Sequence, residues 1–232
     1  HGNRSYCTAI GVSTLDANST GNHNVAIGWS ALSATTDGGQ NVAVGNKAGF
    51  SITGGTGNTC LGEHAGNDVT TGGRNTFVGF YAGDTLTTGS NVTCIGRSAQ
   101  PSSATVSNEI TLGNDDVTSL RCNTQTISSL SDARDKTDVQ ELPEGLDFIS
   151  KLNPVKFQWQ TRDGNSKDGT YEAGFIAQEL QSAQQNADAD YLGLVMDENP
   201  DRLEASYGKL VPMLVKAIQE LKSEVEQLKA NV

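Results

Sequence analysis

A glycine recurs every seventeen residues through residues 1–113 of this 232-residue chain. The residue before each glycine is always aliphatic, and a fixed period of this kind means that each copy is one structural unit stacked on the next. The sequence therefore predicts coils of seventeen residues, with the aliphatic residues forming a continuous core along the axis. The seven pairs are Ile10-Gly11, Ile27-Gly28, Val44-Gly45, Leu61-Gly62, Val78-Gly79, Ile95-Gly96 and Leu112-Gly113.

Each copy has the pattern of a strand rather than of a helix. Its apolar residues fall in bursts of three to five between turn residues, which is the length of a strand. Stacked strands lie about 4.8 Å apart, so seven coils would form a stub about 30 Å long. One coil per layer leaves a chain little interior of its own, so we expect identical neighbouring chains to bury it.

Two residue types are expected to shape the turns. The repeated glycine suits a place where backbones approach closely or where φ is positive. Asparagines that stand four residues before the glycine are expected to turn corners by bonding their own backbone. They are Asn24, Asn41, Asn58 and Asn75, with Asn91 and Asn108 one place earlier in their copies.

Two further columns of the repeat differ in their expected surroundings. The residue two places before the glycine includes Cys60 and Cys94, which we expect to be buried small hydrophobes rather than redox or metal groups. The residue after the glycine varies in size and charge, so it is expected to face solvent. Trp29, Phe80 and the adjacent Tyr81 are candidates for contact with a ligand such as a glycan, although scattered exposed aromatic residues are the commoner explanation.

The pattern Asn-Val-Ala-Ile-Gly-x-x-Ala connects the repeat to known proteins. It stands at Asn24–Ala31 and, with valine in place of isoleucine, at Asn41–Ala48. It resembles the head repeats of trimeric autotransporter adhesins and repeats in phage tail fibres. The resemblance implies a trimeric parallel β-roll or β-prism, with adhesion to a host surface glycan or receptor as its usual role.

Composition disfavours several classes of function. The formal net charge is −11, and an acidic surface repels phosphate backbones, so nucleic acid is not an expected partner. No apolar run approaches the length of a membrane span, so membrane insertion is not expected. The cysteines lack metal-ligand spacing, and we expect neither a metal nor another cofactor. The four are Cys7, Cys60, Cys94 and Cys122.

The second half of the chain has the pattern of a small α+β domain. We divide the chain into a repetitive β-fibre (1–113), a β linker (114–130) and a C-terminal domain (131–232) that ends in a helix over 207–232. The other expected helices cover 142–152 and begin at 178. The expected strands cover 106–112, 117–122, 154–160, 171–177, 192–196 and 203–207, with an extended stretch over 124–129.

The last helix carries a heptad seam, with β-branched residues at a and leucine at d. Its first half is expected to pack on its own domain, and its last two turns, from Glu220, to associate with other copies as a coiled coil. The a and d residues on their own favour a dimer. A coil of about three heptads is weakly specified, so the trimeric repeat decides. The seam consists of Val211, Leu214, Ile218, Leu221, Val225, Leu228 and Val232.

The start of the C-terminal domain carries a candidate for catalysis. A serine is a poor nucleophile until a base removes its proton, and a desolvated lysine can be that base. Ser131 and Lys136 are close enough in sequence for one tight turn to bring them together. The alternative is a helix N-cap, with Ser131 or Asp132 as the cap and the charges in the first turn.

Ring size predicts which bond this serine would cut within Leu130-Ser131-Asp132. Attack by Ser131 on the carbonyl of Leu130 closes a five-membered ring, whereas attack on its own carbonyl closes a four-membered one. The predicted break is therefore the Leu130–Ser131 bond, through an ester intermediate. Arg134 or backbone N–H groups are candidates to stabilise the oxyanion.

Five ordered blocks of the C-terminal domain resemble the intramolecular chaperone of phage endosialidases, tail spikes and neck appendages, which also occurs in a membrane-bound eukaryotic transcription factor. The resemblance implies a domain that trimerises, helps the preceding β-fibre to fold and then cuts itself off with a Ser–Lys dyad. Ser131 is then the nucleophile and Lys136 the base. The blocks are Ser131–Lys136, Leu152–Val155, Gly174–Glu179, Tyr207–Pro212 and Ala217–Leu221.

These patterns together predict a homotrimeric phage or viral tail-fibre or spike fragment, carried on the virion. Its C-terminal domain is expected to drive trimerisation and folding and then to release itself next to Ser131, as a single-turnover serine endopeptidase acting in cis. The alternative is a non-catalytic trimeric surface adhesin whose C-terminal part is only a trimerisation domain. A transcription-factor fragment is disfavoured by the negative charge.

Overall fold

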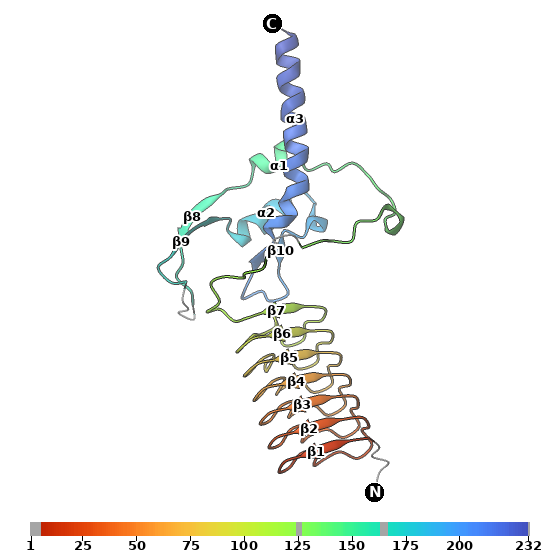
Figure 1. The fold of residues 1–232 in the computed structure, drawn as a ribbon. Helices are drawn as coiled ribbons and strands as arrows, with labels where there is room; N and C mark the ends of the chain where they lie inside the picture. Colours follow the sequence, from red (N-terminus) through yellow and green to blue (C-terminus); the bar gives the residue numbers. More distant parts are fainter. Residues whose placement is uncertain (1–5, 124–126, 163–166, 232) are drawn as a thin grey trace. The chain divides into compact units, whose positions relative to one another are not determined.

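The computed structural model describes residues 6–123, 127–162 and 167–231 (Figure 1). The chain divides into two compact units, the first ending at Thr118 and the second beginning at Ser119. This boundary lies inside the segment 114–130 that was predicted as a linker. The predictions for 124–126 of the extended stretch and for Val232 of the seam lie outside the described residues.

The first unit is a parallel β-solenoid with seventeen-residue coils, as predicted. Seven short strands pair in sequence order in one parallel sheet, and Ala26 in one strand lies opposite Ala43 in the next. Each coil is therefore one copy of the repeat, and Figure 1 shows these coils stacked one on the next. The strands are β1 (Thr8–Ile10), β2 (Val25–Ile27), β3 (Val42–Val44), β4 (Thr59–Leu61), β5 (Thr76–Val78), β6 (Thr93–Ile95) and β7 (Ile110–Leu112).

The interior of the solenoid differs from the predicted one. The aliphatic residue at the end of each strand lies on the outer face, where Val44 is 37% and Ile95 44% exposed. Neighbouring residues of a strand face opposite sides of a sheet, and larger loop residues such as Leu32, Ile52 and Leu86 already fill the interior. The aliphatic row is therefore not the core of a single chain. The buried column is the middle residue of each strand from β2 to β6: Ala26, Ala43, Cys60, Phe77 and Cys94.

Phe77 is a large residue in this column of smaller ones, and two glycines make room for it. A Cβ added to Gly66 or Gly83 would overlap the ring of Phe77. Both glycines also have positive φ, +60° and +61°, a conformation that side chains rarely adopt. The ring and the two glycines are thus matched in shape across two neighbouring coils.

The glycine that follows each strand meets both conditions predicted for it. Gly45 has a φ of +140°, and a Cβ there would lie 2.5 Å from the carbonyl oxygen of Gly62 in the next coil. Glycine therefore recurs with the period of the coil because each coil must bring its backbone this close to the next.

The buried asparagines join neighbouring coils. Asn58 Oδ1 accepts a hydrogen bond from the backbone N–H of Asn75 (3.1 Å), and Asn58 Nδ2 donates to the carbonyl of Gly72 (2.9 Å). Asn41 and Asn24 make the equivalent bonds one and two coils earlier. The prediction that these side chains bond their own corners was wrong, because the buried backbone groups that need partners belong to the adjacent coil.

The second unit is a small α+β domain, as predicted. Strands β8 and β9 form one antiparallel pair, and β10 and β11 form another. The predicted helix over 142–152 is shortened to α1. The elements are η1 (Ala133–Asp135), α1 (Leu146–Ser150), β8 (Val155–Gln158), β9 (Tyr171–Gly174), α2 (Ala177–Asn186), η2 (Asp190–Leu192), β10 (Val195–Met196), β11 (Glu204–Ala205), η3 (Tyr207–Leu210) and α3 (Val211–Ala230).

One predicted strand is missing from the described residues: 117–122 form none. This segment follows β7, which lies at the edge of the solenoid sheet. A single apolar burst does not make a strand without a partner for its backbone groups. The pattern of 117–122 was therefore a wrong indication of a strand.

Helix α3 packs on the rest of its unit through one side of its first half. Phe148 of α1, Leu194 and Met213 are buried in one apolar cluster, and the Glu220 carboxylate accepts a hydrogen bond from Leu146 N at the start of α1 (2.6 Å). The later turns of α3 extend beyond the rest of the unit (Figure 1). The heptad seam lies on the exposed side of the helix: Val211, Leu214, Ile218, Leu221, Val225 and Leu228.

Helix α3 is apolar only along these faces. Among the residues that the structure describes, no helix is long and apolar enough to cross a membrane.

Candidate active site

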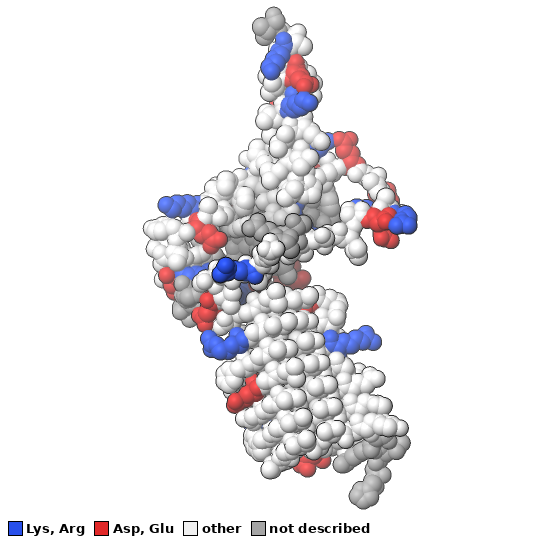
Figure 2. Space-filling view, in the orientation of Figure 1, with Lys and Arg blue, Asp and Glu red and all other residues white. Residues whose placement is uncertain are grey.

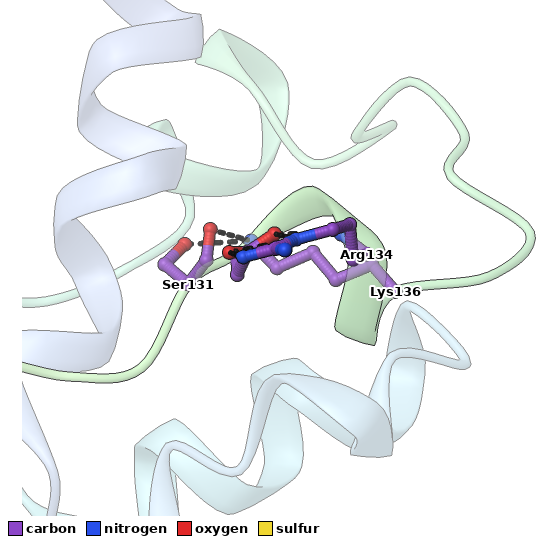
Figure 3. A network of polar contacts seen from close by, with 4 residues as sticks. Ser131, Arg134 and Lys136 are labelled. Atoms are coloured by element: carbon purple, nitrogen blue, oxygen red, sulfur yellow. Dashed lines mark hydrogen bonds and ion pairs between the residues drawn. The ribbon is translucent and has the colours of Figure 1, made fainter.

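The predicted catalytic residues lie on an exposed segment that precedes α1. Ser131 lies two residues before η1, which is a single 3₁₀ turn, and Lys136 is the residue that directly follows η1. None of the three residues of η1 is buried. Figure 3 shows the side chains of Ser131, Arg134 and Lys136 gathered on one side of this turn. The turn that the sequence required is therefore present.

The structure brings the two members of the predicted dyad into contact. Lys136 Nζ lies 2.6 Å from Ser131 Oγ and 3.3 Å from the carbonyl oxygen of Ser131. A base within about 2.6–3.2 Å of the proton that it removes meets the distance required for general-base catalysis. The pair therefore meets the distance requirement for a serine nucleophile and its base.

Asp132 closes the turn that carries the dyad. Its side chain caps η1 by accepting a hydrogen bond from Arg134 N at 2.9 Å. The capping role considered from the sequence is thus filled by Asp132, while Ser131 remains free to meet Lys136. The cap and the dyad are compatible parts of one local structure.

The guanidinium of Arg134 pairs with the same carboxylate. Arg134 Nε lies 3.0 Å and 3.2 Å from the two oxygens of Asp132, and Arg134 Nη2 lies 2.6 Å from Oδ2. Hydrogen bonds from Arg134 lower the pKa of Asp132, and the bond to Asp132 raises the pKa of Arg134. The oxyanion role expected of Arg134 stays a prediction.

The predicted cleavage site is open to solvent. The side chain of Leu130 is 98% exposed, and Ile127 and Val139 on either side are 94% and 80% exposed. The peptide bonds on both sides of Ser131 therefore lie on a surface segment. In one chain this segment is not packed into a core, so water surrounds the dyad.

Two of the four cysteines lie buried in the core of the solenoid. Burial raises the pKa of Cys60 and of Cys94 to about 12, which keeps both as neutral thiols. Their predicted burial in one column is confirmed. Within the described parts of the chain, no group of three or more His, Cys, Asp or Glu residues could hold a metal ion.

The aromatic residues of the repeat pair across neighbouring coils. His64 and Tyr81 stack with ring centroids 4.6 Å apart, and Lys47 Nζ lies 5.4 Å from the ring centroids of Trp29 and of Phe50. The His64–Tyr81 and Lys47–Trp29 contacts join residues about seventeen positions apart, so the sequence indicated them only through the period, whereas Lys47 and Phe50 are three residues apart. Two of the candidate residues for ligand contact, Trp29 and Tyr81, therefore also form contacts between coils.

Comparison with known proteins gives one match. Residues 131–189 match the family model described as the chaperone of endosialidase. No curated protein and no solved structure matches the chain. The match begins at Ser131, the first residue of the motif that holds the dyad, and it extends through β8, β9 and α2. Residues 131–189 of the C-terminal unit are therefore similar to the chaperone of endosialidase, a family of self-cleaving peptidases.

Proposed function

We propose that the chain is part of a phage tail fibre or spike on the virion, and that its C-terminal unit assembles and then releases the β-solenoid. Three copies associate through that unit, the solenoids fold beside one another, and Ser131 then cuts the chain in cis. The mature solenoid is the part that meets a host surface glycan or receptor. The family match supports a tail-fibre chaperone role.

The observation that carries the proposal is the contact between Lys136 Nζ and Ser131 Oγ at 2.6 Å. A lysine five residues after a serine is common on protein surfaces, and most such pairs do not meet. Here a capped turn brings them together, at the residue where the family match begins. These independent observations support the same two residues.

In the first step, the neutral amine of Lys136 takes the proton of Ser131 Oγ. The oxygen then adds to the carbonyl carbon of Leu130 and closes a five-membered ring. The Leu130–Ser131 C–N bond breaks as the nitrogen of Ser131 gains a proton, which leaves Leu130 joined to Ser131 Oγ as an ester. One peptide bond is exchanged for one ester bond, and no other reactant is consumed.

In the second step, water hydrolyses the ester. The Lys136 amine accepts a proton from water, and the hydroxide adds to the ester carbon. The C–O bond to Ser131 then breaks, and Oγ regains its proton. The products are a fibre that ends in the carboxylate of Leu130 and a C-terminal fragment that begins with the amino group of Ser131.

Two uncovered apolar surfaces support association of identical copies. The outer face of the solenoid sheet carries the aliphatic row and a row of Val and Thr, without a charged residue in either. Few charged side chains stand on the face of the solenoid visible in Figure 2. The exposed seam of α3 is the second surface. Large exposed apolar surfaces of this kind mark sites of protein association.

A removable assembly domain fits the physics of such a fibre. The contacts between parallel solenoids join distant parts of three chains, so they form slowly and slip easily in register. A unit that trimerises first raises the local concentration of the solenoids. Cleavage then removes the route by which they assembled, so the fibre is trapped kinetically.

A denaturing gel and intact-mass measurement test the proposal. The wild-type chain is expected to give two fragments, and Ser131→Ala and Lys136→Ala one band of about 24.4 kDa. Ser129→Ala is the matched control, since it removes a neighbouring serine and should cleave as the wild type does. Cleavage by Ser131→Ala would rule out the dyad. A C-terminal fragment that begins with Asp132 instead of Ser131 would rule out the proposed bond.

Light scattering of the uncleaved Ser131→Ala chain tests the assembly step separately. A mass of three times 24.4 kDa is expected. A stable monomer under the same conditions would refute the assembly role, whether or not the wild type cleaves.

A further inference from the structure

The segment that holds the dyad has little besides itself to hold it in shape. The side chains of Ile127, Leu130 and Val139 are 94%, 98% and 80% exposed, and η1 contains no buried residue. The hydrophobic burial that stabilises most turns of helix is therefore missing here. The position of Lys136 relative to Ser131 must come from local hydrogen bonds.

The backbone bonds of the turn are long. Asp135 N lies 3.2 Å from Asp132 O, and Lys136 N lies 3.3 Å from Ala133 O. Hydrogen bonds of a 3₁₀ turn have poor geometry, and one isolated turn is unstable in water. These two bonds alone are weak support for a catalytic distance of 2.6 Å.

The carboxylate of Asp132 supplies the missing support. It accepts from Arg134 N at 2.9 Å, which caps the turn, and from Arg134 Nε at 3.0 Å and Nη2 at 2.6 Å. Charge-assisted bonds of this kind are shorter and stronger than neutral ones. One side chain therefore binds both the backbone and the side chain of the residue in the middle of η1.

The pairing also affects which cation can reach the serine. Arg134 is two residues from Lys136, and its guanidinium has five N–H donors. Without Asp132, this guanidinium would be free to donate to Ser131 Oγ in place of Lys136. When Asp132 binds the guanidinium of Arg134, the hydroxyl of Ser131 is left to interact with Lys136.

We propose that Asp132 is a positioning residue of the self-cleavage reaction: its carboxylate closes the η1 turn and holds Arg134 aside, so that Lys136 Nζ meets Ser131 Oγ. This inference rests on the proposed function and acts through Lys136. Asp132, the residue after the nucleophile, thus acts by positioning Lys136 and not by taking part in the bond changes itself.

The test follows the rate at which freshly synthesised full-length chains are cut, by pulse labelling and denaturing gel. Asp132→Ala removes the cap and the pair, and we expect cleavage to slow about tenfold, from the usual worth of an N-cap. Asp132→Asn keeps a side-chain oxygen at the cap, because Asn caps as well as Asp does. It should recover most of the lost rate. Asp138→Asn removes an exposed negative charge beyond the turn, and Asn tolerates the positive φ of this residue (+49°), so it should cleave at the wild-type rate.

Arg134→Ala separates the two parts of the role. It keeps the cap and removes the competing cation, so we expect a rate within about threefold of the wild type. Such a rate would also assign the oxyanion to backbone N–H groups, the other candidate donors, rather than to Arg134. Asp132→Ala combined with Arg134→Ala should be faster than Asp132→Ala alone, because the freed guanidinium is then gone. The mass of the uncleaved assembly, measured for each variant, confirms that slow cleavage does not come from failed assembly.

Three results would overturn the inference. The first is wild-type cleavage by Asp132→Ala. The second is an Asp132→Asn chain that cleaves as slowly as Asp132→Ala, since closing the turn through the cap would then contribute nothing to the rate. The third is a double variant no faster than Asp132→Ala. Cleavage by Ser131→Ala would overturn the proposed function instead.

Discussion

The two units of this chain use apolar side chains in opposite ways. In the solenoid, sixteen buried residues from Leu15 to Ala99 form one continuous core, and asparagines such as Asn58 satisfy the buried backbone between coils. In the C-terminal unit, the core cluster has six buried residues, while Leu130 and the seam residues of α3 from Val211 to Leu228 stay exposed. The solenoid thus encloses a core of its own behind the exposed outer face of its sheet, whereas the C-terminal unit leaves one side of its longest helix uncovered.

The exposed seam gives the largest expected effect. Ile218 is 66% exposed on α3, so Ile218→Asp should leave the fold of one chain intact. It should abolish trimer formation, because a charge cannot be buried unpaired in a coiled-coil core. Light scattering checks the mass. The matched control is Lys222→Asp, a charge change at an already charged position of the same helix. A trimeric Ile218→Asp chain would break the comparison.

The solenoid core gives the next effect. Phe77 is fully buried and Phe80 is 47% exposed, three residues later. Phe77→Ala should lower the free energy of unfolding by about 4 kcal/mol, since it leaves a cavity that the two flanking glycines cannot fill. Phe80→Ala should cost less than about 1 kcal/mol. Denaturant unfolding of the Ser131→Ala chain measures both, and equal costs would contradict the assignment of inside and outside.

The asparagine ladder comes third. Asn58→Ala leaves the backbone N–H of Asn75 and the carbonyl of Gly72 buried without their partner. We expect a loss of about 3 kcal/mol, from the cost of unsatisfied buried groups. Asn91→Gly is the control, because Asn91 lies on the surface, has a positive φ (+59°) that glycine adopts without strain, and bonds through its side chain only to that of Asn108 in the pairs described here. A change below about 0.5 kcal/mol is expected for it. The same denaturant titration compares the two, and the ladder has no stabilising role if they agree.

The η1 turn gives the smallest effect, and it depends on pH. The pKa of Asp132 is lowered from 3.8, chiefly by its bonds to Arg134. A lowered pKa means that the pairing stabilises the turn above 3.8 and is lost as the pH falls through the folded-state value. In the Ser131→Ala chain, the NMR shift of the Arg134 amide should therefore titrate with a midpoint below 3.8. Arg134→Lys should raise that midpoint, observed on the amide of residue 134. A midpoint at or above 3.8 in the parent chain would contradict the pairing.

Spacing along the chain determined the architecture. The seventeen-residue period identified the coils, the strand positions and the close approach at residues such as Gly45. The period was sufficient because stacked copies place equivalent residues next to each other, and this does not depend on which side-chain contacts they make. The motif at Ser131 and Lys136 likewise indicated a turn that brings the two side chains together, and they lie 2.6 Å apart. Both inferences needed only distances along the sequence.

The tertiary structure alone decided which side of each strand faces inward and which groups bond. Val44 and Ala43 are both apolar, so hydropathy could not choose between them; the space left by Leu32 and Ile52 did. The partners of Asn58 lie fourteen and seventeen residues away, and the hold of Asp132 on Arg134 depends on how one turn closes. The sequence specifies which segments repeat and can therefore stack. The space available to each side chain in the interior, and the hydrogen bonds of a turn, are set only when the chain has folded.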